Sequence, residues 1–144
     1  RIGDISLVRL LKQHGAGIQL RDAEQQTPLH YSSQYGKAEI VKYLLNKGAS
    51  PSSRDDTGFT ALHYAAIGGS LYRRNNSHFD YKATIKILLL RGANINAHSI
   101  GGKKPIDLAR SWGHEDLARL LSLHAAEYRL MSEKKVKGNC TRKR

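Results

Sequence analysis

The chain has 144 residues, of which 40% are hydrophobic and 25% charged, and a formal net charge of +12; this is the size and composition of one globular domain. No apolar run exceeds four residues, which excludes a helix of the ~20 apolar residues that cross a bilayer, and no secretory signal segment opens the chain. The single cysteine, Cys140, excludes an internal disulfide, which leads us to expect a protein of the cytoplasm or the nucleus.

Residues 1–21 contain two glycines twelve positions apart, Gly3 and Gly15, with apolar residues between them. The same arrangement returns at Gly36 and Gly48, which indicates an internal repeat. We interpret residues 1–21 as the first repeat unit, truncated at its start. Because the sequence begins at Arg1 rather than Met, we expect it to be a piece of a longer protein.

Residues 22–54 predict two short helices separated by a glycine. Thr27 suits the position before a helix, and Pro28 suits its first turn. Gly36 favours the left-handed conformation that ends a helix. Apolar residues then recur at helical spacing as far as Gly48, which predicts a second amphipathic helix that stops there.

Residues 55–98 repeat this pattern with an insertion. The tetrapeptide Thr-Pro-Leu-His at 27–30 returns as Thr-Ala-Leu-His at 60–63, in the register of the glycines. The second glycine of the unit is due at position 81 but comes at Gly92. The unit therefore contains 11 additional residues, which we place at about 70–81.

Residues 99–124 predict a fourth unit, and residues 125–144 predict an extension. The tetrapeptide position at 104–107 reads Lys-Pro-Ile-Asp, and Gly113 follows at the expected spacing. Leucines at helical spacing predict that the last helix continues to about Met131. Seven basic and two acidic residues give the extension a net charge of +5, so we expect its end to be partly disordered; the alternative is a nuclear-import or nucleic-acid-binding patch.

The 33-residue period, the two helices and the Thr-Pro-Leu-His signature resemble the ankyrin repeat. The resemblance covers Gly3–His124 and implies an all-α solenoid of stacked helix–turn–helix units with short β-hairpin-like turns. Two features depart from the family pattern. Gln25 stands where the family prefers glycine, and the fourth unit has Lys104, Asp107 and Arg110 in place of Thr, His and a small residue. We attribute the second departure to the solvent-facing end of the stack.

The sequence contains no pattern typical of catalysis, and we expect no catalytic, cofactor-binding or metal-binding residue. Its seven histidines are scattered rather than set at metal-ligand spacing. The resemblance implies that His30 and His63 are structural and tie together the backbones of adjacent turns. No phosphate-binding glycine loop and no nucleophile elbow is present.

The resemblance implies a concave partner-binding surface, built from the turn tips and the exposed side of each first helix. We assign to it Arg21, Glu24, Gln26, Gln34, Tyr35, Arg54, Asp56, Phe59, Ile67, Ile100, Lys103 and Trp112. Tyr35, Phe59 and Trp112 carry the most weight, because aromatic residues are enriched at the energetic centres of interfaces. The alternative is that these aromatic rings pack locally against neighbouring turns.

The insertion is a second candidate surface, because it holds aromatic and basic residues where a flexible linker would hold Gly and Ser. Its candidate contacts are Tyr72, Arg73, Arg74, Phe79 and Tyr81. The alternative is that its aromatic side chains fold back over the adjacent helices.

These features predict a monomeric, non-catalytic protein–protein interaction module that serves as a scaffold, adaptor or regulatory domain. The net positive charge favours a protein partner with an acidic segment. One alternative is the targeting or regulatory part of a larger enzyme or channel. The other is nucleic-acid or chromatin binding through the basic tail and the insertion.

Overall fold

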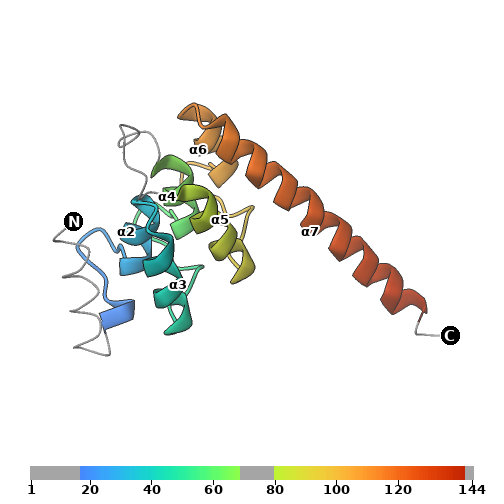
Figure 1. Cartoon of the computed structure of the whole chain (residues 1–144), viewed down its shortest axis with the longest axis horizontal. Coiled ribbons are helices and arrows are strands. Elements are labelled where there is room, and N and C mark those ends of the chain that lie inside the picture. The colour runs from blue at the N-terminus through green and yellow to red at the C-terminus, as the bar shows by residue number, and fades with distance from the viewer. Residues whose placement is uncertain (1–16, 69–79, 142–144) are drawn as a thin grey trace.

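The computed structural model describes residues 17–68 and 80–141. Within these residues the secondary structure is helical, as predicted, and contains no strand. In this part of the chain a 3-10 turn, η1 (Gly17–Gln19), precedes six α-helices: α2 (Pro28–Gln34), α3 (Ala38–Asn46), α4 (Ala61–Ile67), α5 (Tyr81–Leu90), α6 (Pro105–Ser111) and α7 (Glu115–Thr141). Consecutive helices pair as α2–α3, α4–α5 and α6–α7, and the pairs stack side by side (Figure 1). The first helices α2, α4 and α6 form one layer, and α3 and α5 form a second layer that packs against it.

The first helices begin where the sequence predicts, because of local hydrogen bonds. Thr27 and Thr60 adopt extended backbone conformations directly before α2 and α4. In each helix a histidine at the third position turns back to accept a hydrogen bond from the amide of that threonine. Pro28, at the first position of α2, lacks an N–H group that the helix would in any case leave without a partner.

The core lies between the two layers and continues from one unit to the next. Its fully buried large apolar side chains are Leu29, Val41, Leu44, Leu62, Ile85, Leu88 and Leu121. They come from five of the six described helices, so no helix pair has a core of its own. Stacking of neighbouring units therefore provides the stability of the fold.

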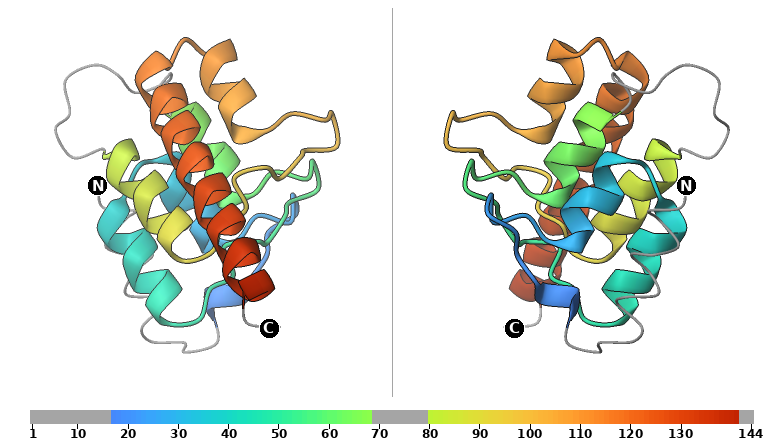
Figure 2. Two further views of the ribbon diagram at one scale, coloured as in Figure 1. Left: turned by 90° about the vertical axis from the view of Figure 1, so that its right-hand side faces the viewer. Right: turned by 90° about the vertical axis from the view of Figure 1, so that its left-hand side faces the viewer.

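A tight turn projects from the stack directly before each of the first helices α2, α4 and α6 (Figure 2). A backbone hydrogen bond closes each turn: Asp22 N to Gln26 O at 3.1 Å, Asp55 N to Phe59 O at 3.0 Å, and Ser99 N to Lys103 O at 2.9 Å. We call these three turns the tips. Gln25 has a φ of 64°, and glycines occupy the equivalent positions of the other two tips. The departure noted at Gln25 thus falls where the backbone requires the left-handed region.

The predicted extent of the insertion is wrong at its end, because Tyr81 is the first residue of α5. Its ring is half-buried against the core, and its hydroxyl donates to the carbonyl oxygen of Gln34 at 3.1 Å. Tyr81 is therefore a packing residue of the stack. The other insertion candidates, Tyr72, Arg73, Arg74 and Phe79, lie outside the described residues.

The last helix is longer than predicted, since α7 runs to Thr141 rather than to about Met131. A glycine with a positive φ follows each of the second helices: Gly48 comes after α3 and Gly92 comes after α5. Ala125 stands one repeat period after Gly92, so α7 has no such stop signal and continues. None of the helices in the described parts of the chain has the length and apolarity to span a membrane.

Candidate functional site

Hydrogen bonds join the three tips into one row. The Arg21 guanidinium donates to the carbonyl oxygens of Arg54, at 2.7 Å, and Gln25, at 3.0 Å. The Arg54 guanidinium donates in the same way to the carbonyl of His98 at 3.2 Å. Arg21, Arg54 and His98 occupy equivalent positions in three units. The two predicted partner contacts Arg21 and Arg54 are exposed, but their side chains also fix the spacing of the tips.

Backbone hydrogen bonds reinforce this row. The amide of Asp56 donates to the carbonyl of Glu24 at 3.1 Å, and the amide of Ile100 donates to the carbonyl of Thr57 at 3.0 Å. Figure 2 shows the three tips projecting together on one side of the helices. The exposed side chains of Glu24, Asp56, Ile100 and Lys103 are therefore carried on a row of tips that is held together along its length.

A tyrosine–aspartate pair connects a tip to its first helix in two units. In the first pair, the Tyr31 hydroxyl donates to the Asp22 carboxylate, which also accepts from the amides of Glu24 at 3.0 Å and Gln26 at 2.9 Å. These bonds, the one from Tyr31 above all, lower the pKa of Asp22. In return, the bond to Asp22 raises the pKa of Tyr31 to about 12.

The second pair is more buried. The Tyr64 hydroxyl donates to the Asp55 carboxylate, which also accepts from the amides of Thr57 and Phe59, each at 2.9 Å. Burial opposes ionisation of Asp55, but the hydrogen bonds outweigh it and its pKa lies below the usual value. Burial, together with the bond to Asp55, raises the pKa of Tyr64.

Tyr31, Tyr64, Asp22 and Asp55 are not among the residues that the sequence patterns predicted to be functional. A signal was present, because the two tyrosines, and likewise the two aspartates, are separated by one repeat period. The fourth unit has Ser99 and a leucine at the equivalent positions, so it lacks the pair that the second and third units have. Tyr31, the fourth residue of α2, is 36% exposed.

The two histidines of the repeated tetrapeptide tie one unit to the next. Nδ1 of His30 accepts from the amide of Thr27 at 2.9 Å, so Nε2 carries the proton and donates to the carbonyl of Phe59 at 3.0 Å. His63 makes the same bonds, to Thr60 at 3.0 Å and Lys103 at 2.9 Å. Burial lowers the pKa of both imidazoles, which favours the neutral ring that this geometry requires.

The large apolar residues of the predicted surface differ in exposure. Ile100 is 79% exposed on its tip, and Trp112 is 50% exposed at the end of α6. Phe59 is only half-buried rather than freely exposed. Its ring stacks on the His63 ring with centroids 5.1 Å apart and meets the Tyr64 ring edge-on at 5.5 Å. The Phe59 ring therefore packs locally against neighbouring side chains, which is the alternative given above for the aromatic residues of the predicted surface.

The remaining predicted residues of this surface are half-buried: Gln26 in the first tip, Gln34 and Tyr35 at the end of α2, and Ile67 at the end of α4. The Gln26 amide donates to the Tyr64 hydroxyl at 2.7 Å, so it too bridges two units. Among the residues with described positions, no three His, Cys, Asp or Glu side chains form a metal-binding cluster.

Two family models match the chain. One, described as ankyrin repeats in three copies, matches residues 1–74. The other, described as ankyrin repeat, matches residues 57–100. No curated protein matches the chain.

Proposed function

The chain belongs to the ankyrin-repeat family, and from this premise we propose that it binds a partner protein with the exposed side chains of its tips and first helices. Ankyrin repeats are generally protein–protein interaction modules, and the family is typically non-catalytic. The proposal assigns binding, rather than chemistry, to the described part of this chain.

The observation that carries the proposal is the pair of exposed apolar side chains on the fourth unit. Ile100 and Trp112 expose large apolar side chains on elements that the stack holds in place. Exposed apolar groups on a rigid support lose little conformational freedom on binding, which favours affinity. Glu24, Asp56 and Lys103 add exposed charges along the tips, and such polar groups suit the rim of an interface.

The test is affinity capture from cell lysate with the wild-type chain and with an Ile100→Asp/Trp112→Ala variant. A Leu123→Ala variant is the matched control, because Leu123 is an exposed apolar residue on α7, away from the tips. We expect a protein that the wild type and the control retain at high salt and that the double variant loses. Equal capture by all three chains would contradict the proposal.

Nucleic-acid binding is the second candidate, and the net charge of +12 favours it. Phosphate contacts release counterions, so affinity for nucleic acid would fall steeply as the salt concentration rises. The same capture, repeated at two salt concentrations, separates the candidates. Recovery of nucleic acid that high salt removes, and that the double variant retains, would favour this second function.

A further inference from the structure

Three exposed cations stand at the same position of the repeat on α3, α5 and α7. Lys42 of α3 and Lys86 of α5 correspond once the 11 additional residues are allowed for, and Arg119 of α7 follows Lys86 by one period. All three side chains are exposed. Within the described residues, no ion pair joins any of them to a carboxylate. Because equivalent positions of stacked units point to the same side, the three cations form a row.

Exposed leucines lie beside this row, on the next turn of the helices. Leu90 of α5 is 82% exposed, and Leu123 of α7, one period later, is 60% exposed. Leu130 stands two helical turns after Leu123 on the same side of α7, and it is 57% exposed. We call the row of three cations and these three leucines the second-layer face. It combines positive charge with apolar side chains that protrude.

The second-layer face is separate from the tips. Figure 2 shows α3 and α5 on the side of the molecule away from the tips. The tips and first helices comprise residues 21–35, 51–68 and 98–112, and the second helices of the stack comprise residues 36–48, 80–92 and 114–124. The first group contains five basic and five acidic residues, and the second contains seven basic and four acidic residues. The net positive charge of the described stack therefore lies on the side of the second helices.

The carboxylates of the second helices lie at the helix starts, where they do not neutralise the row of cations. They are Glu39, Asp80, Glu115 and Asp116. Asp80 caps α5, since its carboxylate accepts a hydrogen bond from an amide of the first turn. Asp116 lies 3.9 Å from the amine of Lys82. The cations of the row and the leucines lie farther along the helices.

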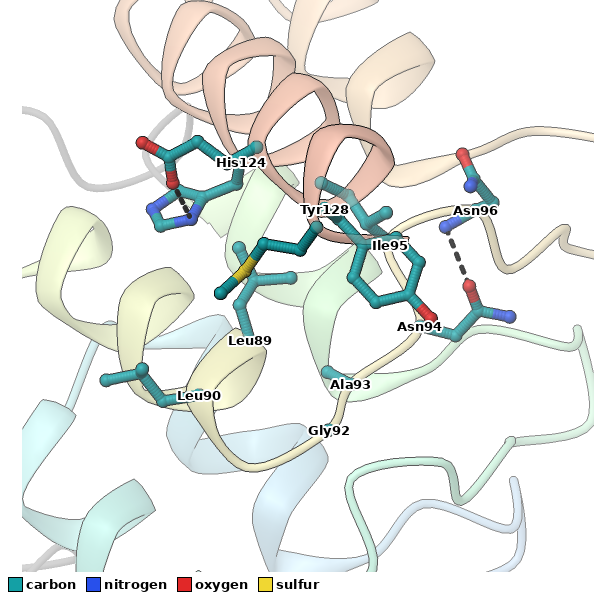
Figure 3. Close-up of a pocket in the computed structure, with 11 residues that line it drawn as sticks. Leu89, Leu90, Gly92, Ala93, Asn94, Ile95, Asn96, His124 and Tyr128 are labelled. Atoms are coloured by element: carbon teal, nitrogen blue, oxygen red, sulfur yellow. Dashed lines mark hydrogen bonds and ion pairs between the residues drawn. The ribbon is translucent and has the colours of Figure 1, made fainter. Parts of the chain in front are cut away.

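A pocket continues the apolar surface from Leu90 towards α7. It has a volume of about 550 Å³ and lies between the end of α5, the turn that follows and α7 (Figure 3). Tyr128 and Met131 line it and are 70% and 72% exposed. The carboxylate that lines the pocket, Glu127, lies 3.7 Å from Nδ1 of His124. Apolar area that an apolar phase could cover thus extends beyond the leucines.

We propose that the second-layer face binds the surface of a membrane that contains anionic lipids. Anionic headgroups attract cations that come close to the bilayer surface. Leu90, Leu123 and Leu130 then enter the boundary between headgroups and acyl chains, where apolar side chains leave water. The tips remain free to bind a protein, because they project from the other side of the helices.

Three other occupants match the face less well. Nucleic acid would neutralise the cations, but its phosphate backbone offers no apolar group to the leucines. A peptide would cover Leu90 and Leu123 on one side only, because they protrude instead of lining a recess, whereas a fluid lipid layer surrounds a protruding side chain. A second copy of the chain would place like charges against one another.

The test is flotation of the chain with vesicles of phosphatidylcholine, either pure or with about 30% phosphatidylserine as the anionic lipid. We expect the partition coefficient to be at least about tenfold higher for the anionic vesicles. A Leu90→Ser/Leu123→Ser variant, the leucine variant, should lower it about tenfold or more. A Lys42→Gln/Lys86→Gln/Arg119→Gln variant, the cation variant, should do the same. The substituted side chains are exposed, so both melting temperatures should match the wild type.

Two matched controls separate the face from the charge and apolarity of the whole chain. Lys103→Gln/Lys104→Gln/Arg110→Gln removes the same number of positive charges from the tip and first helix of the fourth unit. At about 0.15 M salt, charges more than about 8 Å from the bilayer are screened, so this control should bind the anionic vesicles as the wild type does. Ile100→Ser removes an apolar side chain that is 79% exposed on a tip, and it should also retain vesicle binding. Loss of a protein partner and loss of lipid binding are therefore measured independently.

Four results would overturn the proposal. The first is no flotation with either kind of vesicle. The second is an equal loss in the cation variant and its matched control, which would show that net charge alone causes binding. The third is vesicle binding that the leucine variant retains. The fourth is a different occupant, either duplex DNA, polyglutamate or a second copy of the chain, that binds more tightly than the anionic vesicles and is lost in the cation variant.

Discussion

The Tyr64 hydroxyl donates a hydrogen bond to the Asp55 carboxylate, and through it the side chain of α4 is fixed to the tip of its own unit. The same hydroxyl accepts a hydrogen bond from the side-chain amide of Gln26 at 2.7 Å, which comes from the preceding tip. One phenol therefore links two tips and a helix. The equivalent Tyr31–Asp22 pair is more exposed.

This difference in exposure predicts unequal effects of two matched variants. Tyr64→Phe should lower the free energy of unfolding by about 1–2 kcal/mol, because it removes a half-buried bond to a charged group. Tyr31→Phe should lower it by less than about 1 kcal/mol, because water replaces an exposed bond more readily. Urea denaturation of the three chains measures both values. Equal losses would show that burial does not distinguish the pairs.

The buried histidines predict that the protein becomes less stable as the pH falls below about 6.5, the ordinary pKa of the residue. Burial lowers the pKa of His30 and His63 in the folded chain. Just below pH 6.5 the unfolded chain therefore binds more protons than the folded chain, and acid favours unfolding. Their contribution to stability is complete above that pH and is lost as the pH drops toward the folded-state pKa values.

Denaturation midpoints measured from pH 8 to pH 5 test this dependence. The carboxylates Asp22 and Asp55 also have lowered pKa values, but their contribution is lost only near and below pH 3.8. A His63→Gln variant should be less stable at pH 8 and show a shallower slope between pH 8 and pH 5. A wild-type stability that rises toward pH 5 would contradict the assignment of neutral, buried rings.

A close approach at Gly68 predicts that this position does not accept a side chain. A Cβ atom built there would lie 2.3 Å from the carbonyl oxygen of Gln34 and 2.3 Å from Cε1 of Tyr81. Gly68→Ala should therefore cost about 1–3 kcal/mol through overpacking. Gly101→Ala is the control, because its Cβ would meet only the Ser99 hydroxyl at 3.8 Å. Thermal melts that are the same for both variants would rule out a tight contact at Gly68.

Two aromatic residues of the predicted surface should respond differently to substitution. Phe59→Ala removes a ring packed on His63 and Tyr64, so it should lower the free energy of unfolding by about 1–3 kcal/mol. Trp112→Ala removes a half-exposed ring and should cost less than about 1 kcal/mol. Chemical denaturation compares the two. If Trp112→Ala proved the more destabilising, Trp112 would be a packing residue rather than a contact.

The sequence alone determined the features that depend on interactions between residues close together in the chain, such as helix starts and turns. Thr27 and Thr60 were predicted to precede helices, and they do, because helix starts depend on hydrogen bonds within one turn. The unusual residue Gln25 was identified from the register of the repeat, and its backbone is left-handed. The repeat period itself determined the fold, since each unit needs a neighbour to bury its apolar face.

Only the tertiary structure decided what each candidate surface residue contacts. Arg21 and Arg54 reach carbonyl groups of the next tip, and Phe59 packs on a ring of its own unit. Tyr81 enters the stack although the sequence placed it in the insertion. The last helix, α7, has no glycine stop signal and continues past the position at which α5 ends, and a pocket lies between the end of α5, the turn after it and α7. These outcomes depend on the distances between units in space, which the order of residues along one unit does not specify.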